Sequence, residues 1–319
     1  MRWLMVTSLI FVFSVIGFSA TLDVPTAAYP TIQSAINAAA WVGDTVRVAP
    51  GTYMENIDFS GKAVMVKSSD GAYVTVIDGG QLRSVVTFDK GEGAGSVLDG
   101  FTIRNGSGTI INGYQACGGG IFCDNASSPT IINNEIVTNV VQYYGGGIYC
   151  QYGSSPLIKG NLVMENLSQD DGAGIACWFD SNAHITDNRI LFNHAFGGGG
   201  GIDCWDSDVI VTDNMIAHND SLNSSGGGMR AVSYANPVIT SNTFCENFAA
   251  GSGGGIAGMS YTNLKIYNCI FWDDMAPTIP EIYLWNFSTA SVNFSNVAGG
   301  YAGPGNIALP PMFVSQPAC

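Results

Sequence analysis

Apolar residues recur through the middle of the chain at a fixed interval of 27 residues. Each recurrence follows a glycine-rich segment, and an apolar residue stands three positions after the first glycine of that segment. The six segments begin at Gly118, Gly145, Gly172, Gly199, Gly226 and Gly253. A constant period between 20 and 50 residues is typical of a solenoid, whose successive coils bury one another's faces.

Two further apolar columns share this period, and around all three columns apolar and polar residues alternate with a period of two. Alternation of this kind indicates short β-strands, so we predict three strands per coil and a three-sheet parallel β-helix. About ten coils at one strand spacing each give a rod roughly 50 Å long. The two further columns are Ile131, Ile158, Ile185, Val211, Ile239, Ile266 and Ile136, Val163, Ile190, Ile216, Phe244, Phe271.

Asparagine forms two columns of its own in the same register. Asparagine tolerates left-handed backbone at corners, and its amide can bond the coils above and below, so both columns are interpreted as structural. The intervals of 26 and 28 residues on either side of Asn214 cancel, which places the length changes in turns. The columns are Asn134, Asn161, Asn188, Asn214, Asn242 and Asn139, Asn166, Asn193, Asn219, Asn247.

Four of the eight cysteines form another column, two residues beyond the apolar position of each strand. They are Cys123, Cys150, Cys177 and Cys204. Their side chains are expected to point inward, with Cβ atoms of neighbouring coils about 4.8 Å apart, beyond the usual disulfide separation. We predict a reduced, buried thiol stack; a vertical disulfide and a metal site are the less favoured alternatives.

The two ends of the chain depart from the repeat. Residues 1–20 begin with a basic residue, continue with an apolar run and end with small residues, which indicates a secretory signal peptide. We expect residues 21–319 to form one β-helix domain. Its parts are a helical cap at about 30–41 with Ile32, Ala35, Ile36 and Ala39 as its apolar face, irregular coils at 44–113, regular repeats at 118–272, and a C-terminal coil at 273–319 without an evident cap or anchor module.

Composition narrows the range of partners. The net charge is −14 and only 11 residues are Lys or Arg, which excludes nucleic acid as a general partner. The same charge disfavours an anionic polysaccharide unless a cation bridges the two. No later segment is long and apolar enough to cross a membrane. We therefore expect a secreted or cell-surface monomer, with a polysaccharide or cell-surface glycan as a candidate partner.

Short motifs at the start, in the repeats and at the end of the chain resemble one known group. They are 31–36 (TIQSAI), 43–46 (GDTV), 50–53 (PGTY), 98–103 (LDGFTI), the repeated Gly-Gly-Gly-Ile-x-Cys, 268–272 (NCIFW) and 305–307 (GNI). This set resembles the pectin lyase-like superfamily, and in particular bacterial exported right-handed parallel β-helix repeat proteins. The resemblance implies a right-handed helix. That superfamily includes lyases, hydrolases, epimerases and adhesins, so it leaves the activity open.

The outward side of the strands after the glycine segments is the first candidate site. Trp178 and Trp205 are expected to stack on adjacent coils beside Asp203 and Arg230, with Tyr149 further along the sheet. Aromatic rings flanked by an acid and a base are typical of a sugar-binding cleft. Stacked rings and a cross-strand ion pair that only stabilise the sheet are the alternative interpretation.

The turns before the glycine segments are the second candidate site. Asp170 and Asp171, with His194 one coil later and Arg230 beyond, resemble the Asp-Asp, His and Arg sites of polygalacturonase-type glycosidases. Inverting hydrolysis needs such paired carboxylates. The chain departs from that pattern, because no Asn-Thr-Asp precedes the pair and no Arg-Ile-Lys follows.

A pectate-lyase mechanism needs clustered carboxylates for Ca²⁺ and a nearby base. Asp203, Asp206 and Arg230 are the set nearest to that description, but they form no Ca²⁺ motif, and no cofactor is predicted. We expect a non-catalytic protein with a carbohydrate-contacting, structural or adhesive role. A polysaccharide lyase or glycoside hydrolase is the alternative.

Overall fold

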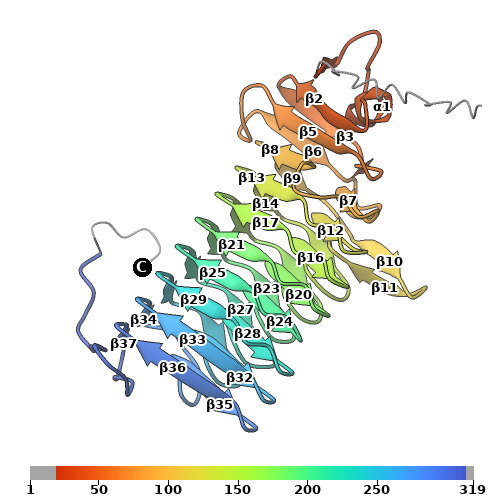
Figure 1. Ribbon diagram of the computed structural model, residues 1–319. Helices are drawn as coiled ribbons and strands as arrows, with labels where there is room; N and C mark the ends of the chain where they lie inside the picture. The colour runs from red at the N-terminus through yellow and green to blue at the C-terminus, as the bar shows by residue number, and fades with distance from the viewer. Residues whose placement is uncertain (1–18, 314–319) are drawn as a thin grey trace, which may run out of the picture.

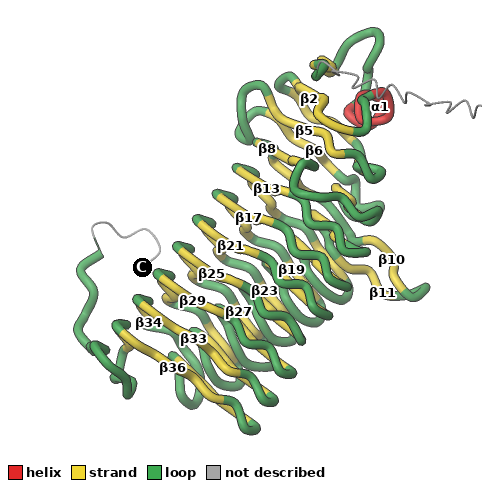
Figure 2. Tube along the Cα trace, viewed as in Figure 1, coloured by secondary structure: helices red, strands yellow, loops and turns green. Residues whose placement is uncertain are grey.

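A computed structural model describes residues 19–313, which form a rod of stacked β-coils (Figure 1). Three long parallel sheets run along the rod, and each receives one strand from almost every coil (Figure 2). This arrangement confirms the predicted parallel β-helix. The predicted signal peptide, residues 1–20, lies almost entirely outside the described residues. No helix within residues 19–313 has the length and apolarity needed to cross a bilayer.

The first sheet contains β1 (Thr21–Val24), β2 (Val42–Val48), β5 (Ala63–Ser68), β8 (Val97–Asp99), β13 (Thr130–Ile132), β17 (Leu157–Lys159), β21 (His184–Thr186), β25 (Ile210–Thr212), β29 (Val238–Thr240), β33 (Asn263–Tyr267) and β36 (Thr289–Asn293). The second sheet contains β3 (Gly51–Met54), β6 (Thr75–Asp78), β9 (Thr102–Arg104), β14 (Glu135–Val137), β18 (Leu162–Met164), β22 (Arg189–Leu191), β26 (Met215–Ala217), β30 (Thr243–Cys245), β34 (Ile270–Trp272) and β37 (Asn296–Val297).

The third sheet follows the glycine segments and contains β4 (Ile57–Asp58), β7 (Val86–Phe88), β12 (Ile121–Cys123), β16 (Ile148–Gln151), β20 (Ile175–Trp178), β24 (Ile202–Trp205), β28 (Met229–Val232), β32 (Ile256–Met259) and β35 (Ile282–Trp285). A short fourth sheet, absent from the sequence prediction, contains β15 (Val140–Val141), β19 (Leu167–Ser168), β23 (His194–Ala195), β27 (Asp220–Ser221) and β31 (Phe248–Ala249).

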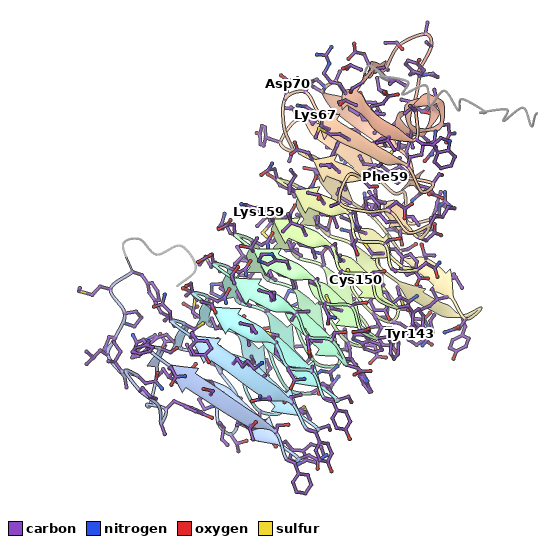
Figure 3. All side chains as sticks on the ribbon, viewed as in Figure 1. Phe59, Lys67, Asp70, Tyr143, Cys150 and Lys159 are labelled. Atoms are coloured by element: carbon purple, nitrogen blue, oxygen red, sulfur yellow. The ribbon has the colours of Figure 1, made fainter. Side chains whose placement is uncertain are left out.

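The predicted columns are confirmed as in-register pairs. In the third sheet Cys123 pairs with Cys150, then Cys177, then Cys204, and the first apolar column pairs in the same way. All four thiols are free and buried, so the reduced thiol stack is confirmed. Figure 3 labels Cys150 within this stack.

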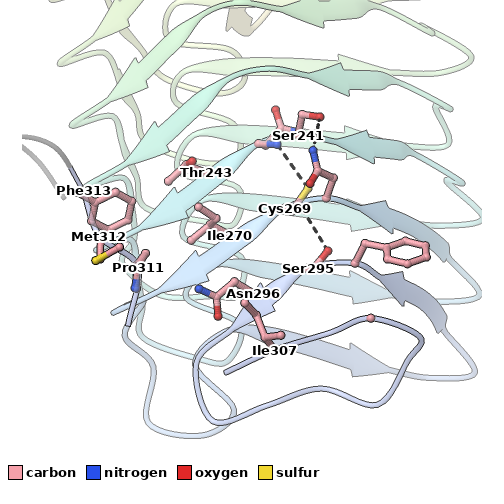
Figure 4. Close-up of a pocket in the computed structure, with 14 residues that line it drawn as sticks. Ser241, Thr243, Cys269, Ile270, Ser295, Asn296, Ile307, Pro311, Met312 and Phe313 are labelled. Carbon is pink, nitrogen blue, oxygen red and sulfur yellow. Dashed lines mark hydrogen bonds between the residues drawn. The ribbon is translucent and has the colours of Figure 1, made fainter. Parts of the chain in front are cut away.

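The first asparagine column forms a continuous ladder of hydrogen bonds. The backbone N–H of Asn134 donates to Oδ1 of Asn161 at 2.9 Å, and the pattern repeats down to Asn242. Beyond the predicted column, Cys269 and then Ser295 occupy the same position and accept the backbone N–H of the preceding coil. The N–H of Ser295 in turn donates to Oδ1 of Asn306. Figure 4 shows the Cys269 and Ser295 steps beside a pocket of about 500 Å³ against the C-terminal segment.

The second ladder ends on an acid. It runs from Asn139 to Asn247, and the N–H and side-chain amide of Asn247 both donate to Oδ1 of Asp274, at 2.9 and 2.8 Å. Asp274 is 5% exposed, and the equally buried carboxyl of Glu281 lies against it. An asparagine position has therefore become one half of a buried carboxyl pair.

Length changes lie in turns, as the compensating intervals predicted. The turn after β24 has one residue with positive φ, Asp206, whereas the turn after β20 has two, Phe179 and Asp180. The connection from β27 to the next glycine segment is one residue longer and restores the register. Both ladders continue unbroken through this coil.

The N-terminal end is covered by α1 (Ile32–Ala38), a shorter helix than the sequence predicted. Ile32, Ala35 and Ile36 are fully buried, as expected for its apolar face, and Thr31 caps its start. Lys62 donates from Nζ to the carbonyls of Ile36, Asn37 and Ala39 at the other end of the helix, at 2.7–2.8 Å. Orphan backbone groups at both ends of this helix are thus satisfied from the first coils.

Glu55 ties this cap to the rod, because its two carboxylate oxygens accept the N–H groups of Ile32 and Gln33, each at 2.9 Å. Replacing Glu55 with alanine is expected to lower the free energy of unfolding by about 1–2 kcal/mol, the usual cost of losing a helix cap. Chemical denaturation measures the change, with Glu135→Ala on β14 as a control. Equal midpoints for both variants would show that the cap contributes nothing to the rod.

Other departures concern the irregular coils. Gly100 separates β8 from β9, and its φ of 81° turns the chain at a corner. An unpredicted antiparallel hairpin, β10 (Thr109–Ile111) and β11 (Gln115–Cys117), projects from the rod (Figure 1).

Candidate functional site

The two candidate surfaces converge on the outer side of the third sheet. Asp203 pairs with Arg230 in the register of β24 and β28, and Trp178 pairs with Trp205 in β20 and β24. The sequence register therefore placed these residues correctly. The turns before the glycine segments lie over this side of the sheet, so both candidate surfaces belong to one region.

The first candidate site was expected to be exposed to solvent, and this expectation is wrong for most of its residues. Tyr149 is 1% exposed, Trp178 is 6% exposed and Asp203 is fully buried, while Trp205 is half-buried. These side chains point away from the main core, but they are covered by a second apolar cluster. Its outer members are Ile111 of the hairpin and the turn residues Tyr143 and Tyr144. Tyr149 and Trp178 therefore support this surface from below, and the residues that cover them form its exposed part.

Asp203 lies at the centre of a buried hydrogen-bond network. The indole Nε1 of Trp178 donates to one carboxylate oxygen at 2.7 Å, and Nε of Arg230 donates to the other at 2.6 Å. These contacts join three successive coils. Burial, opposed by the charge of Arg230, raises the pKa of Asp203 to about 6.

Asp171 completes the network from the turn before β20. Its Oδ2 lies 2.8 Å from Nη2 of Arg230, and its Oδ1 accepts the backbone N–H of Gly198 at 2.7 Å. A Cβ atom on residue 198 would lie 2.5 Å from Cδ of Arg230. Glycine at this position therefore leaves free the space through which the Arg230 side chain reaches Asp171. Burial opposes the charged form of Arg230, but the two carboxylates outweigh it and raise the guanidinium pKa above its usual value.

His194 does not join this network. It lies on β23, and its Nδ1 is 2.8 Å from Oδ2 of Asp220 on β27; this hydrogen bond raises the pKa of His194. The polygalacturonase-like set is thus divided: Asp171 meets Arg230, and His194 meets a different acid. Asp170 is half-buried beside Asp171, and its carboxylate accepts no hydrogen bond from the described residues.

The set suggested for Ca²⁺ is also not assembled. Asp203 is enclosed in its ion pair, whereas Asp206 is exposed in the following turn. Within residues 19–313 the carboxylates that come close enough together to hold a metal are Asp58, Asp89 and Glu92. Nζ of Lys90 already lies 2.8 Å from both aspartates there.

An aromatic surface that the sequence reasoning missed covers the buried network. We call it the aromatic face. Its rings form a connected series of contacts with centroid separations between 4.0 and 6.2 Å. Its solvent-facing members are Tyr114, Tyr143, Tyr144, Tyr152, Phe179 and Trp205. Figure 3 labels Tyr143 near the hairpin end of this face.

One signal in the sequence could have indicated the hairpin. Asn112-Gly113 stands between two short β-prone runs, and such a dipeptide favours a tight hairpin turn. Ile111 pairs with Gln115, so the loop consists of residues 112–114. Asn112 and Gly113 both adopt positive φ, 51° and 81°. The strand register puts Tyr114 at the tip, where it is 63% exposed.

The fold and this surface together define an elongated parallel β-helix with a partly exposed aromatic face over a buried charge network. Residues 51–214 and 173–298 match the family model described as "Right handed beta helix region". The chain belongs to this family, which also confirms the predicted right-handedness. A comparison with curated proteins finds no match.

Proposed function

We propose that this protein is exported and contacts glycans, without catalysis, through the aromatic face. The observation that carries the proposal is the set of solvent-facing rings from Tyr114 on the hairpin to Trp205 on β24, which the buried ring of Trp178 joins into one connected series. Sugar C–H groups pack on aromatic rings, and a rigid β scaffold holds such rings at fixed separations. The apolar start of the chain supports export, since its pattern is that of a secretory signal.

The charge network supports binding over chemistry. A general acid or base must reach the proton that it transfers. Asp203 is fully buried beneath Trp178, and both oxygens of Asp171 are engaged by Arg230 and Gly198. The network therefore holds the turn that carries Asp170 and Asp171 against the third sheet, and so supports the aromatic face.

One observation favours the second candidate, a polysaccharide lyase or hydrolase. Asp171 and Asp203 share Arg230, and burial raises the pKa of Asp203 to about 6. Acid–base cleavage of a glycosidic bond requires a pair of carboxyls, one of which holds a proton for the leaving group. A ligand would have to displace the turn that covers them.

The test is a polysaccharide panel scored both for binding and for product release. We expect binding without turnover, and an affinity about three- to tenfold weaker in Trp205→Ala and Tyr152→Ala, the range of a single aromatic contact. Tyr267→Ala, an exposed ring on β33 in the first sheet, is the matched control, and melting temperatures confirm that each variant folds. Unchanged affinity in both variants would refute the aromatic face, and turnover by the wild type would favour the enzyme.

A further inference from the structure

We propose that the hairpin end of the aromatic face is a cage for a cationic group, and that its glycan ligand carries free amino groups. The cage consists of Tyr114, Tyr143 and Tyr144 with the carboxylate of Asp170. This inference rests on the proposed glycan contact and specifies its ligand class.

The three tyrosine rings meet at steep angles. Tyr143 lies at 72° to Tyr114 and at 63° to Tyr144, with centroids 6.2 and 5.8 Å apart. Rings arranged in this way form walls, whereas those of Tyr152 and Phe179 stack at 11° and cover one another. Trp178 backs Tyr144 from below at 4.0 Å, so the position of this wall is fixed from the buried side.

Asp170 supplies a carboxylate without a partner at the same place. It is half-buried, and within residues 19–313 its side chain forms neither a hydrogen bond nor an ion pair. The backbone N–H of Gly145 donates to the carbonyl of Asp171 at 3.3 Å, so the turn that carries Asp170 lies against the turn that carries Tyr143 and Tyr144. Burial and the charge of Asp170 together raise the pKa of Tyr144 to about 12. Arg230, the nearby cation of the network, is buried and already shared by Asp171 and Asp203.

An ammonium group satisfies both parts of this arrangement. The faces of aromatic rings attract cations, and a nearby carboxylate adds direct charge complementarity. A uronate carboxylate would be repelled by Asp170 and by the net charge of −14. Among the described residues no unpaired cation lies beside the cage to offset this repulsion. The aromatic face continues from Tyr152 at the end of β16 to Phe179 and Trp205 on the next two coils, a length that suits a polymer and not a single small amine.

The experiment is calorimetric titration of the whole chain with three oligosaccharides of equal length. They are β-1,4-linked glucosamine, its fully N-acetylated form and galacturonate. We expect the glucosamine oligomer to bind at least about tenfold more tightly than the other two, with an affinity that falls as salt is added. Asp170→Asn is expected to weaken that oligomer at least about threefold and to leave the acetylated form unchanged. Asp213→Asn, an exposed acid on the first-sheet side, is the control.

The outcomes separate the two proposals. Equal binding of the acetylated or galacturonate oligomer would overturn the cage and leave the glycan contact standing. Binding of none of the three, together with no binding in the wider panel, would overturn both. Equal affinity for a lysine-rich peptide would show that the cage recognises an amine without its sugar. Tyr143→Ala, checked for an unchanged melting temperature, must reduce glucosamine binding, and wild-type affinity in that variant would also overturn the cage.

Discussion

Replacing Arg230 with leucine is expected to lower the free energy of unfolding by about 3–5 kcal/mol, the cost of removing one partner from a buried ion pair. Arg230 is 8% exposed and lies 2.6 Å from Asp203 and 2.8 Å from Asp171. Without the guanidinium, the fully buried Asp203 has no opposing charge and retains only the indole of Trp178.

The loss should grow with pH. Burial already raises the pKa of Asp203 to about 6, and removal of Arg230 raises it further, so acid pH relieves the unpaired charge by protonation. Denaturation at pH 5 and pH 8 measures this difference. The double variant Asp203→Asn with Arg230→Leu is expected to recover much of the stability at pH 8. Equal losses in the single and double variants would show that lost packing, and not the unpaired charge, causes the effect.

Replacing Asp274 with asparagine should stabilise the protein above neutral pH and leave its stability in acid almost unchanged. Asp274 occupies a ladder position held by asparagine in the five preceding coils. Burial raises the pKa of Asp274 well above its usual value and that of Glu281 to about 7, and each carboxyl has one buried oxygen without a partner in the described structure.

The direction follows from proton linkage. Both acids have a higher pKa in the folded chain than in the unfolded chain, so the folded state binds more protons over the range in which they titrate, which for Glu281 extends to about pH 7. Their contribution to stability is fully present in acid, and the contribution of Glu281 is lost as the pH rises through about 7. The gain from asparagine is therefore expected to be larger at pH 8 than at pH 5, because asparagine carries no charge that burial can oppose.

Melting temperatures from pH 5 to pH 8.5 test this expectation. Asp213→Asn, at an exposed acid in the turn after β25, is the control, since it makes the same change in charge away from the pair. A stabilisation by Asp274→Asn that is equal at pH 5 and pH 8 would contradict the titration of the pair. Asp203 also titrates in this range, so the remaining pH dependence of the variant is expected to be smaller and not zero.

Sequence reasoning could predict the core because every coil repeats the same contacts. Ile148, Cys150 and their equivalents occur at a constant interval, and parallel pairing keeps equivalent residues adjacent. The asparagine ladders follow for the same reason. The ladder steps at Cys269, Ser295 and Asn306 were missed because different side chains perform the same bonding there.

The burial of Trp178 could not be predicted in this way. Its cover comes from Tyr144 in a turn whose residues differ in every coil, and from a hairpin that occurs once. Alternation within a strand distinguishes the two sides of a sheet, but it does not show whether another segment covers the outer side. The same limit explains why Asp171 and Asp203 were assigned to separate candidate sites when one arginine joins them.

The shortened turn at Asp206 and the longer connection after β27 have a consequence for how such a protein can change over evolutionary time. Register is carried by the ladders and the apolar columns, and not by the number of residues between them. If a complete coil were gained or lost in tandem, equivalent positions of the remaining coils would become neighbours. Every contact between coils would then still have a partner of the same kind. Rod length is therefore free to vary in steps of one coil, while corner segments such as the hairpin can diversify independently of the core.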